Sequence, residues 1–153
     1  GRIEVYDGNS AVEASPMTRG NFVYVPQGNT LFSGTVRDNL LLGCPEAGEE
    51  MLWAALHTAE ADFVRQLPQG LDTVCGEKGT GLSEGQAQRI AIARGLLRPG
   101  SIMLFDEFSS SLDSATEERL LDNLSAEASG KTMIFITHRE KVCSYCDGFL
   151  HFE

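Results

Sequence analysis

One stretch of the chain, residues 79–113, restricts the fold more than any other, because it joins a helix start to an acidic strand end. Ser83 is followed three residues later by Gln86, a spacing typical of a capping box at the start of a helix. Apolar residues then recur at helical spacing: Ile90, Ala93, Leu96 and Leu97. We therefore predict a helix that begins after Ser83 and ends near Arg98-Pro99-Gly100.

The start of this predicted helix has the properties of an anion site. The first backbone N–H groups of a helix lack intrahelical acceptors, and the helix dipole favours negative charge there. Gly85 lies in the first turn, where the missing side chain lets a phosphate come close to the backbone. We therefore expect this helix start to face a phosphate group.

A short apolar run, Ile102–Phe105, follows and ends in Asp106 and Glu107. This pattern predicts a buried parallel strand that carries two carboxylates at its carboxyl end. Adjacent side chains of a strand point to opposite faces, so the two acids should have different roles. We expect Asp106 to face a Mg²⁺ ion and Glu107 to face an attacking water.

The composition excludes several classes of protein. With 153 residues, 42% of them hydrophobic, the chain fits one domain with its own core. Its net charge of −10 and dispersed basic residues predict that it binds no nucleic acid. No apolar run approaches the roughly 20 residues that span a bilayer, so we expect no direct membrane insertion by this segment.

Four cysteines occur, at positions 44, 75, 143 and 146. Only Cys143 and Cys146 have a CxxC spacing, which supplies half of a zinc site. The sequence therefore predicts reduced thiols, and we assign no metal ligand to this pair.

Five motifs occur in an order that resembles one family, the ABC ATPases. Leu82–Gln86 (LSEGQ) resembles their LSGGQ signature, with Glu84 in place of a glycine, and Ile102–Glu107 resembles their Walker B strand with its catalytic glutamate. Ser111–Asp113 resembles their D-loop, Gln27 their Q-loop glutamine and His138 their switch histidine. From the residues alone, Gln27 could be a surface turn residue, His138 a core histidine and Asp113 a capping residue, which would not conflict with a subunit contact.

The phosphate-binding loop GxxxxGK[ST] of this family is missing from the chain. Gly130-Lys131-Thr132 imitates its end, but Ser125 occupies the position of its first glycine. We expect a helix from about residue 115 to 128, with a capping box from Ser114 to Glu117, that ends at Gly130 as its C-cap. The resemblance implies that the phosphate-binding loop lies upstream of Gly1.

Several other segments carry predictions of their own. Thr35 and Asp38 should begin a short helix within a decamer, residues 31–40, that resembles the exporter segment in contact with the transmembrane domain. The spacing predicts two helices, at 49–56 and 61–67. Two more segments resemble family elements: an exporter loop at 72–79 that contains Glu77, and the last family strand at 147–152.

The resemblance implies an α/β fold of the P-loop NTPase type: a parallel sheet core, residues 1–27 and 99–153, with an inserted helical subdomain, residues 28–98. It implies ATP and Mg²⁺ as cofactors. The implied site residues form three groups. Glu107, His138 and Gln27 are catalytic; Asp106 and Gln27 bind the metal; Ser83, Gly85, Gln86 and Asp113 bind ATP, partly that of the opposite subunit.

The implied partners are a second ABC ATPase domain, in a homo- or heterodimer, and the transmembrane domain of an exporter. The implied location is the cytoplasmic face of the membrane, and the isolated chain should be inactive as an ATPase. A DNA-repair or chromosome-organising ABC protein is an alternative, disfavoured because residues 27–83 lack sustained heptads. A non-catalytic regulatory partner is the other, disfavoured because Glu107 and His138 are present.

Overall fold

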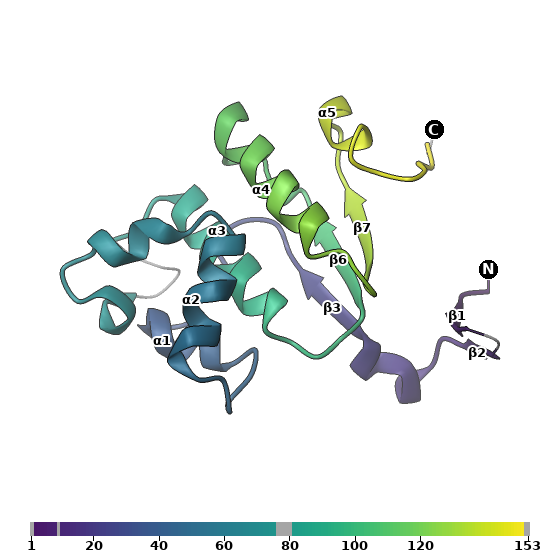
Figure 1. Ribbon diagram of the computed structural model, residues 1–153, viewed down its shortest axis with the longest axis horizontal. Helices are drawn as coiled ribbons and strands as arrows, with labels where there is room; N and C mark the ends of the chain where they lie inside the picture. The colour runs from purple at the N-terminus through teal and green to yellow at the C-terminus, as the bar shows by residue number, and fades with distance from the viewer. Residues whose placement is uncertain (1, 9, 76–80, 152–153) are drawn as a thin grey trace.

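Three parallel strands form the centre of the structure, in the order β3-β6-β7 (Figure 1). They are β3 (Phe22–Val25), β6 (Ile102–Asp106) and β7 (Thr132–Ile136). The structure is a computed structural model that describes residues 2–8, 10–75 and 81–151. The predicted parallel strands are confirmed: β6 pairs with β3 on one side and with β7 on the other.

The two faces of this sheet differ in burial. On the inner face, Val23, Met103 and Met133 lie side by side in register, and Val23 and Met103 are buried. On the outer face, Tyr24 is 55% exposed and Ile134 is 44% exposed. The predicted buried strand, β6, is buried at Met103 and Phe105 on the inner face and partly buried at Ile102 and Leu104 on the outer face, which no described helix covers.

Helices α3 (Glu84–Leu96) and α4 (Ser114–Ala126) contribute buried side chains to the core on the inner face (Figure 1). α3 comes so close to the sheet that a Cβ on Gly95 would lie 2.8 Å from Cγ2 of Val25. Three aromatic rings, those of Phe105, Phe108 and Phe135, pack against one another with centroids 5.0–5.6 Å apart. This core fixes the strand ends on which the site is built.

The shorter elements of residues 34–75 pack around α3. They are β4 (Gly34–Thr35), α1 (Val36–Leu41), α2 (Glu49–Thr58), the 3₁₀ helices η2 (Asp62–Gln66) and η3 (Gly70–Asp72), and β5 (Val74–Cys75). Thr35 caps α1 in a capping box with Asp38, as predicted. The helix predicted at 61–67 is present as the 3₁₀ helix η2: its hydrogen bonds join residues three apart, and Pro68 follows too soon for a longer helix.

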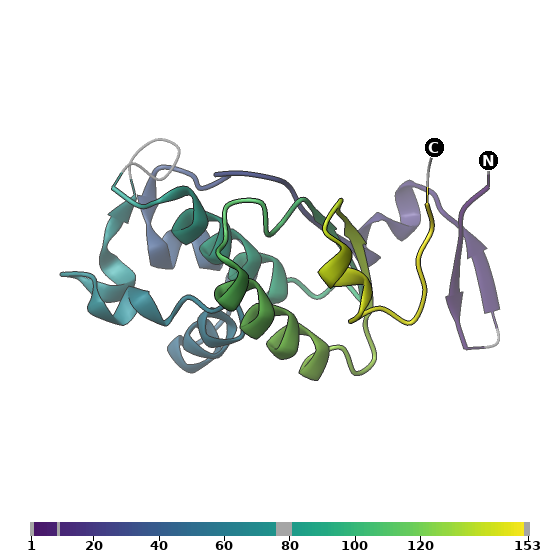
Figure 2. The same cartoon turned by 90° about the horizontal axis from the view of Figure 1, so that it is seen from above.

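An antiparallel hairpin, β1 (Glu4–Asp7) with β2 (Ser10–Glu13), lies apart from the rest of the structure (Figure 2). The 3₁₀ helix η1 (Pro16–Asn21) connects it to β3. The sheet and its helices, and not this hairpin, therefore hold the predicted site residues.

The ends of α4 differ from the prediction. Asp113, not Ser114, is the N-cap residue, because its carboxylate accepts the backbone N–H groups of Ala115 and Thr116. The helix ends with Glu127 as its C-cap, and Gly130 lies beyond it with a φ of 74°. The predicted capping box and the predicted glycine C-cap are both wrong.

Among the residues described after β7, one short helix forms, α5 (Glu140–Cys143), and it lies beside α4. Residues 147–151 form no strand, so the prediction of a last strand is wrong over the residues described there. Phe149 is 79% exposed and Leu150 is 85% exposed, which shows that this segment packs on no strand edge.

The predicted role of Glu77 lies outside the described residues. None of the helices described has the length and apolar character that crossing a bilayer requires.

Candidate functional site

The predicted catalytic residues follow the carboxyl ends of the three parallel strands. Gln27 comes two residues after β3, Glu107 directly after β6, and His138 two residues after β7. Parallel strands end at one edge of their sheet, so these three positions share that edge. Gln27 is exposed there, in a bend.

His138 and Glu107 are in direct contact. The His138 Nδ1 atom lies 3.0 Å from the Glu107 Oε1 atom. The imidazole is 78% exposed, whereas the carboxylate is only 23% exposed. A ligand arriving from solvent would therefore meet the histidine with the acid directly behind it.

The backbone at Glu107 sets this arrangement. Its N–H group donates a 2.9 Å hydrogen bond to the carbonyl of Ile136, and its φ of 44° is unusual for a residue with a side chain. The chain leaves the strand direction at this residue. The strain marks a position that the surrounding structure holds in place, as is common at functional sites.

Asp106 has a different partner. The hydroxyl of Tyr24 on β3 donates a 2.7 Å hydrogen bond to its Oδ2 atom. This bond, more than any other cause, raises the pKa of the Tyr24 hydroxyl above its usual value. The two adjacent acids thus have separate surroundings, and only one oxygen of Asp106 is engaged by the tyrosine.

The donor set fits a magnesium ion only as a site shared with water or phosphate. The described residues contain no group of three or more His, Cys, Asp and Glu side chains that could hold a metal. Mg²⁺ commonly takes only one or two oxygen ligands from a protein and completes its shell with water and phosphate. Asp106 and Gln27 supply such oxygens.

The start of α3 is a capping box, as predicted. The Ser83 Oγ atom accepts the backbone N–H of Gln86 at 3.2 Å, and the Gln86 Oε1 atom accepts the backbone N–H of Ser83 at 2.9 Å. The side-chain carbonyl of Gln86 is thereby used inside the helix cap. The Ser83 hydroxyl accepts with its oxygen, so its own hydrogen can still be donated to an anion.

Gly85 is buried in the first turn of α3, against the loop before α4. A Cβ at this position would lie 2.8 Å from the carbonyl oxygen of Ser111. The sequence suggested glycine for the approach of a phosphate, and the structure gives a different reason, a close contact within the chain. This contact joins the segment that resembles the signature, Leu82–Gln86, to the segment that resembles the D-loop, Ser111–Asp113.

Asp113 ends that loop and caps α4. Its carboxylate accepts the Thr116 N–H at 3.0 Å, the Thr116 hydroxyl at 2.8 Å and the Ala115 N–H at 3.1 Å. These hydrogen bonds, led by that from the Thr116 backbone, lower the pKa of the Asp113 carboxyl. Asp113 therefore has a structural role whatever else it contacts.

Two residues of α3 that the sequence reasoning missed tie the helix to the segment after β3. Gln88 is 1% exposed, and its Nε2 atom donates to the Pro26 carbonyl at 3.2 Å. Arg94 donates to the Thr30 carbonyl at 3.1 Å and to the Thr30 hydroxyl at 3.0 Å. The sequence offered one signal for these contacts: Gln88 and Arg94 are polar residues among the apolar residues of a helix.

A cavity of about 530 Å³ opens beside the same segment. Tyr24, Phe32, Asn39, Leu42, Arg94 and Arg98 are among its lining residues. Phe32 and Leu42 are 62% and 58% exposed. The cavity therefore presents apolar side chains and arginines close to the end of β3.

Comparisons with known proteins identify the family of the chain. A family profile described as ABC transporter matches residues 1–110. ABC transporter ATM1 of Toxoplasma gondii is 44% identical over 130 residues, 84% of this chain and 12% of that protein. The mycobactin import ATP-binding/permease protein IrtB of Mycolicibacterium thermoresistibile is 40% identical over 155 residues, 100% of this chain and 27% of that protein.

A solved structure of a bacterial Atm1-family ABC exporter with ATP bound has a TM-score of 0.78 and 42% identity to this chain. The similarity covers 82% of this chain and 22% of that one. The chain thus spans between 12% and 27% of the length of these three relatives. Because the family match covers residues 1–110 of 153, this chain belongs to the ABC transporter family, as part of a nucleotide-binding domain of the exporter type.

Proposed function

We propose that this chain acts in ATP hydrolysis by an ABC exporter, and that it contributes to two ATP sites at once. The observation that carries the proposal is the contact of Glu107 with His138 at the carboxyl edge of a parallel sheet. In such folds ligands bind outside this edge. The second contribution is the start of α3, which lies in a different part of the chain.

At the sheet edge, Glu107 is the general base. Its carboxylate accepts the proton of the attacking water, and His138 holds the carboxylate in position while its exposed ring donates to the terminal phosphate. Mg²⁺, when bound with ATP, would offset phosphate charge. Asp106 and Gln27 would hold it, and Gln27 would also orient the water.

At the start of α3, Ser83 and Gly85 serve the nucleotide of the opposite subunit. The backbone N–H groups of the first turn and the Ser83 hydroxyl would bind its terminal phosphate. Gln86 supports this turn through the capping box. Asp113 lies beyond the loop that packs on Gly85, so the partner's contact with this loop would be felt at the signature. The partner is a second ABC ATPase domain, the same or a related chain.

The cavity beside β3 suits the transmembrane partner. Exposed Phe32 and Leu42 offer an apolar contact, and Arg98 offers a charge for an acidic side chain. Arg94 of α3 is hydrogen-bonded to Thr30, so a movement of the segment after β3 would be transmitted directly to α3. We place the domain at the cytoplasmic face of the membrane on this account.

The chain by itself should not turn over ATP. It contains no GxxxxGK[ST] loop to hold the phosphates, and the apolar outer face around Tyr24 and Ile134 is open to solvent. The remainder of the nucleotide-binding domain would cover that face. Calorimetry with MgATP tests this: we expect weak binding and no phosphate release, and steady turnover by the isolated chain would refute the incomplete site.

A mixed-dimer experiment tests the assignment of Ser83 and Gly85 to the opposite site. It uses two versions of a longer protein that includes the phosphate-binding loop: one carries Ser83→Arg, and the other carries a disabled loop. In the mixed dimer one site has two intact halves, so hydrolysis should return although each variant alone is nearly silent. The control pairs a wild-type subunit with a subunit that carries both changes, which leaves both halves intact within one chain. If this control dimer hydrolyses ATP and the mixture of the two single variants stays inactive while mixed dimers form, the assignment is contradicted.

A further inference from the structure

The turn after α5 holds two cysteines that have no part in the proposed function. Cys143 is the last residue of α5 and is exposed, and Cys146 is partly buried against the core. Both are free thiols. No cluster of three metal-binding side chains exists among the described residues, so this pair lacks the further ligands of a zinc site.

The backbone holds these two residues close together. The Cys146 N–H donates a 3.2 Å hydrogen bond to the Cys143 carbonyl, which closes a four-residue turn. Such a turn brings its end Cα atoms within about 7 Å, and disulfides form across Cα separations of about 4.4–6.8 Å. The backbone therefore needs little or no movement for the two sulfurs to be joined.

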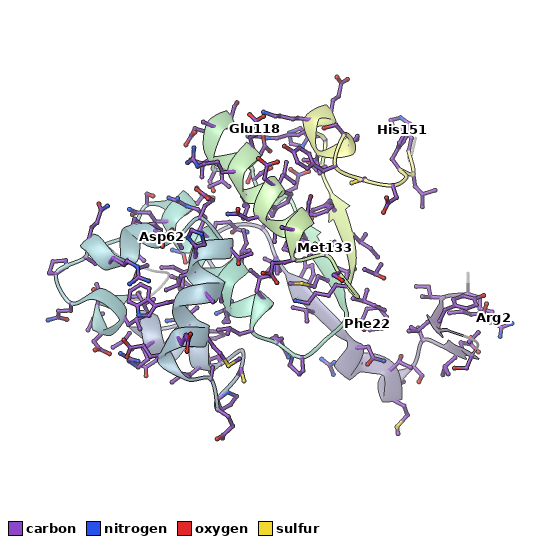
Figure 3. The ribbon with its side chains drawn as sticks, in the orientation of Figure 1. Arg2, Phe22, Asp62, Glu118, Met133 and His151 are labelled. Atoms are coloured by element: carbon purple, nitrogen blue, oxygen red, sulfur yellow. The ribbon has the colours of Figure 1, made fainter. Side chains whose placement is uncertain are left out.

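The neighbouring contacts hold this turn against α4. Val142 is 1% exposed, and the Tyr145 hydroxyl donates to Asp122 of α4 at 3.0 Å. Lys141 donates to Glu118, labelled in Figure 3 on α4, at 2.8 Å. The turn is thus anchored on both sides of Cys143, which is itself exposed.

From this placement we propose that Cys143 and Cys146 form a reversible local disulfide by exchange with a small-molecule disulfide such as glutathione disulfide. This goes beyond the proposed function and does not depend on it. The pair is a site of oxidation with one exposed thiol, that of Cys143, and it follows His138 closely in the sequence.

The exchange proceeds in two steps. The Cys143 thiolate attacks one sulfur of glutathione disulfide, so a Cys143–glutathione bond forms, the glutathione disulfide bond breaks, and one glutathione leaves and takes up a proton. Cys146 then loses its proton to solvent and attacks the Cys143 sulfur, which releases the second glutathione. Two cysteine thiols are oxidised, and one glutathione disulfide is reduced to two glutathione thiols.

The surroundings decide the order of the two cysteines. Cys143 is exposed and can meet the reagent first. Burial, and to a smaller degree Cys143 and Asp147, raises the pKa of the Cys146 thiol, which also donates to the Val142 carbonyl at 3.4 Å. Cys146 is therefore the less reactive thiol toward the reagent in solution, and acts as the resolving thiol.

The test incubates the folded chain at a fixed ratio of reduced to oxidised glutathione, blocks free thiols by alkylation and cleaves after Lys141. The resulting peptide, residues 142–153, contains both cysteines and no other. We expect that neither cysteine of this peptide is alkylated, that its mass is lower by two hydrogens, and that it carries no glutathione. Separate glutathione adducts, two free thiols, or a link to Cys44 would overturn the proposal.

Two variants and one control sharpen the result. Cys146→Ser should retain glutathione on Cys143, because no second thiol resolves the adduct, whereas Cys143→Ser should remain largely alkylated. The control repeats the wild-type measurement in urea, which needs no variant to fold. The folded chain should hold at least as large a fraction of the disulfide as the unfolded chain, and a clearly smaller fraction contradicts a preformed turn.

Discussion

Gly85 in the first turn of α3 touches the backbone of Ser111 so closely that a Cβ would lie 2.8 Å from its carbonyl oxygen. Gly85 belongs to the segment that resembles the ABC signature, and Ser111 to the segment that resembles the D-loop. Their contact means that the two segments cannot shift independently. Any motion of the loop before α4 is passed to the helix start that we assign to the opposite ATP.

Gly85→Ala should therefore destabilise the chain. Overpacking costs about 1–3 kcal/mol, which exceeds or offsets the roughly 1 kcal/mol that alanine gains over glycine within a helix. The measurement is the urea midpoint of the isolated chain. Gly20→Ala is the control, because a Cβ there meets nothing within 4 Å and its stability should stay nearly unchanged. Equal midpoints for the two variants would contradict the Gly85 contact.

The two faces of the central sheet should respond differently to truncation. Phe105 is fully buried on the inner face, so Phe105→Ala should cost about 3–5 kcal/mol, enough to unfold a marginal chain. Ile134, on the adjacent strand but 44% exposed, should cost clearly less when changed to alanine. Circular dichroism during urea unfolding compares them. Similar losses would show that the outer face is covered in solution.

Arg94 should not tolerate replacement by lysine. Its guanidinium donates two hydrogen bonds to Thr30, and a lysine ammonium cannot reproduce that fork, so we expect a loss of about 1–2 kcal/mol. Arg98→Lys is the matched control, because Arg98 is exposed and lies beyond the end of α3. Thermal unfolding measures the stability of both variants. An Arg94→Lys protein as stable as wild type would show that the hydrogen bonds of Arg94 to Thr30 are not essential.

The cap of α4 should make stability depend on acid. The pKa of Asp113 is lowered in the folded state, so its contribution is fully present above its ordinary pKa of 3.8 and is lost as the pH falls through the lower folded value. Asp113→Asn keeps an acceptor without a charge. The stability gap between wild type and this variant should shrink in urea titrations from neutral pH to about pH 3. A gap that is constant with pH would contradict the charged cap.

The sequence predicted those features that depend on neighbouring residues. The helix start at Thr35, the capping box at Ser83 and the apolar strands were predicted because their signals span only a few residues. The contact of Tyr24 with Asp106, 82 positions away, depends on strand order, which periodicity does not reveal. Gln88 was missed because its hydrogen-bond partner, the Pro26 carbonyl, is also distant in the sequence.

The errors had local causes too. Asp113 and Ser114 are both good capping residues, and only the observed hydrogen bonds decide between them. The segment 147–151 has the apolar residues of a strand but lies exposed and pairs with neither edge strand of the described sheet, β3 or β7, which composition alone does not reveal.

The most direct test of the central claim is the hydrolysis rate of Glu107→Gln in a longer protein that includes the phosphate-binding loop. Removal of the general base should lower the rate by about 10²–10⁴ while ATP binding is retained, because the groups that bind the phosphates remain. His138→Ala should show a similar loss. Glu118→Gln, which removes a carboxylate on α4 that pairs with Lys141, is the control and should hydrolyse ATP normally. Near-normal turnover by Glu107→Gln would contradict the account.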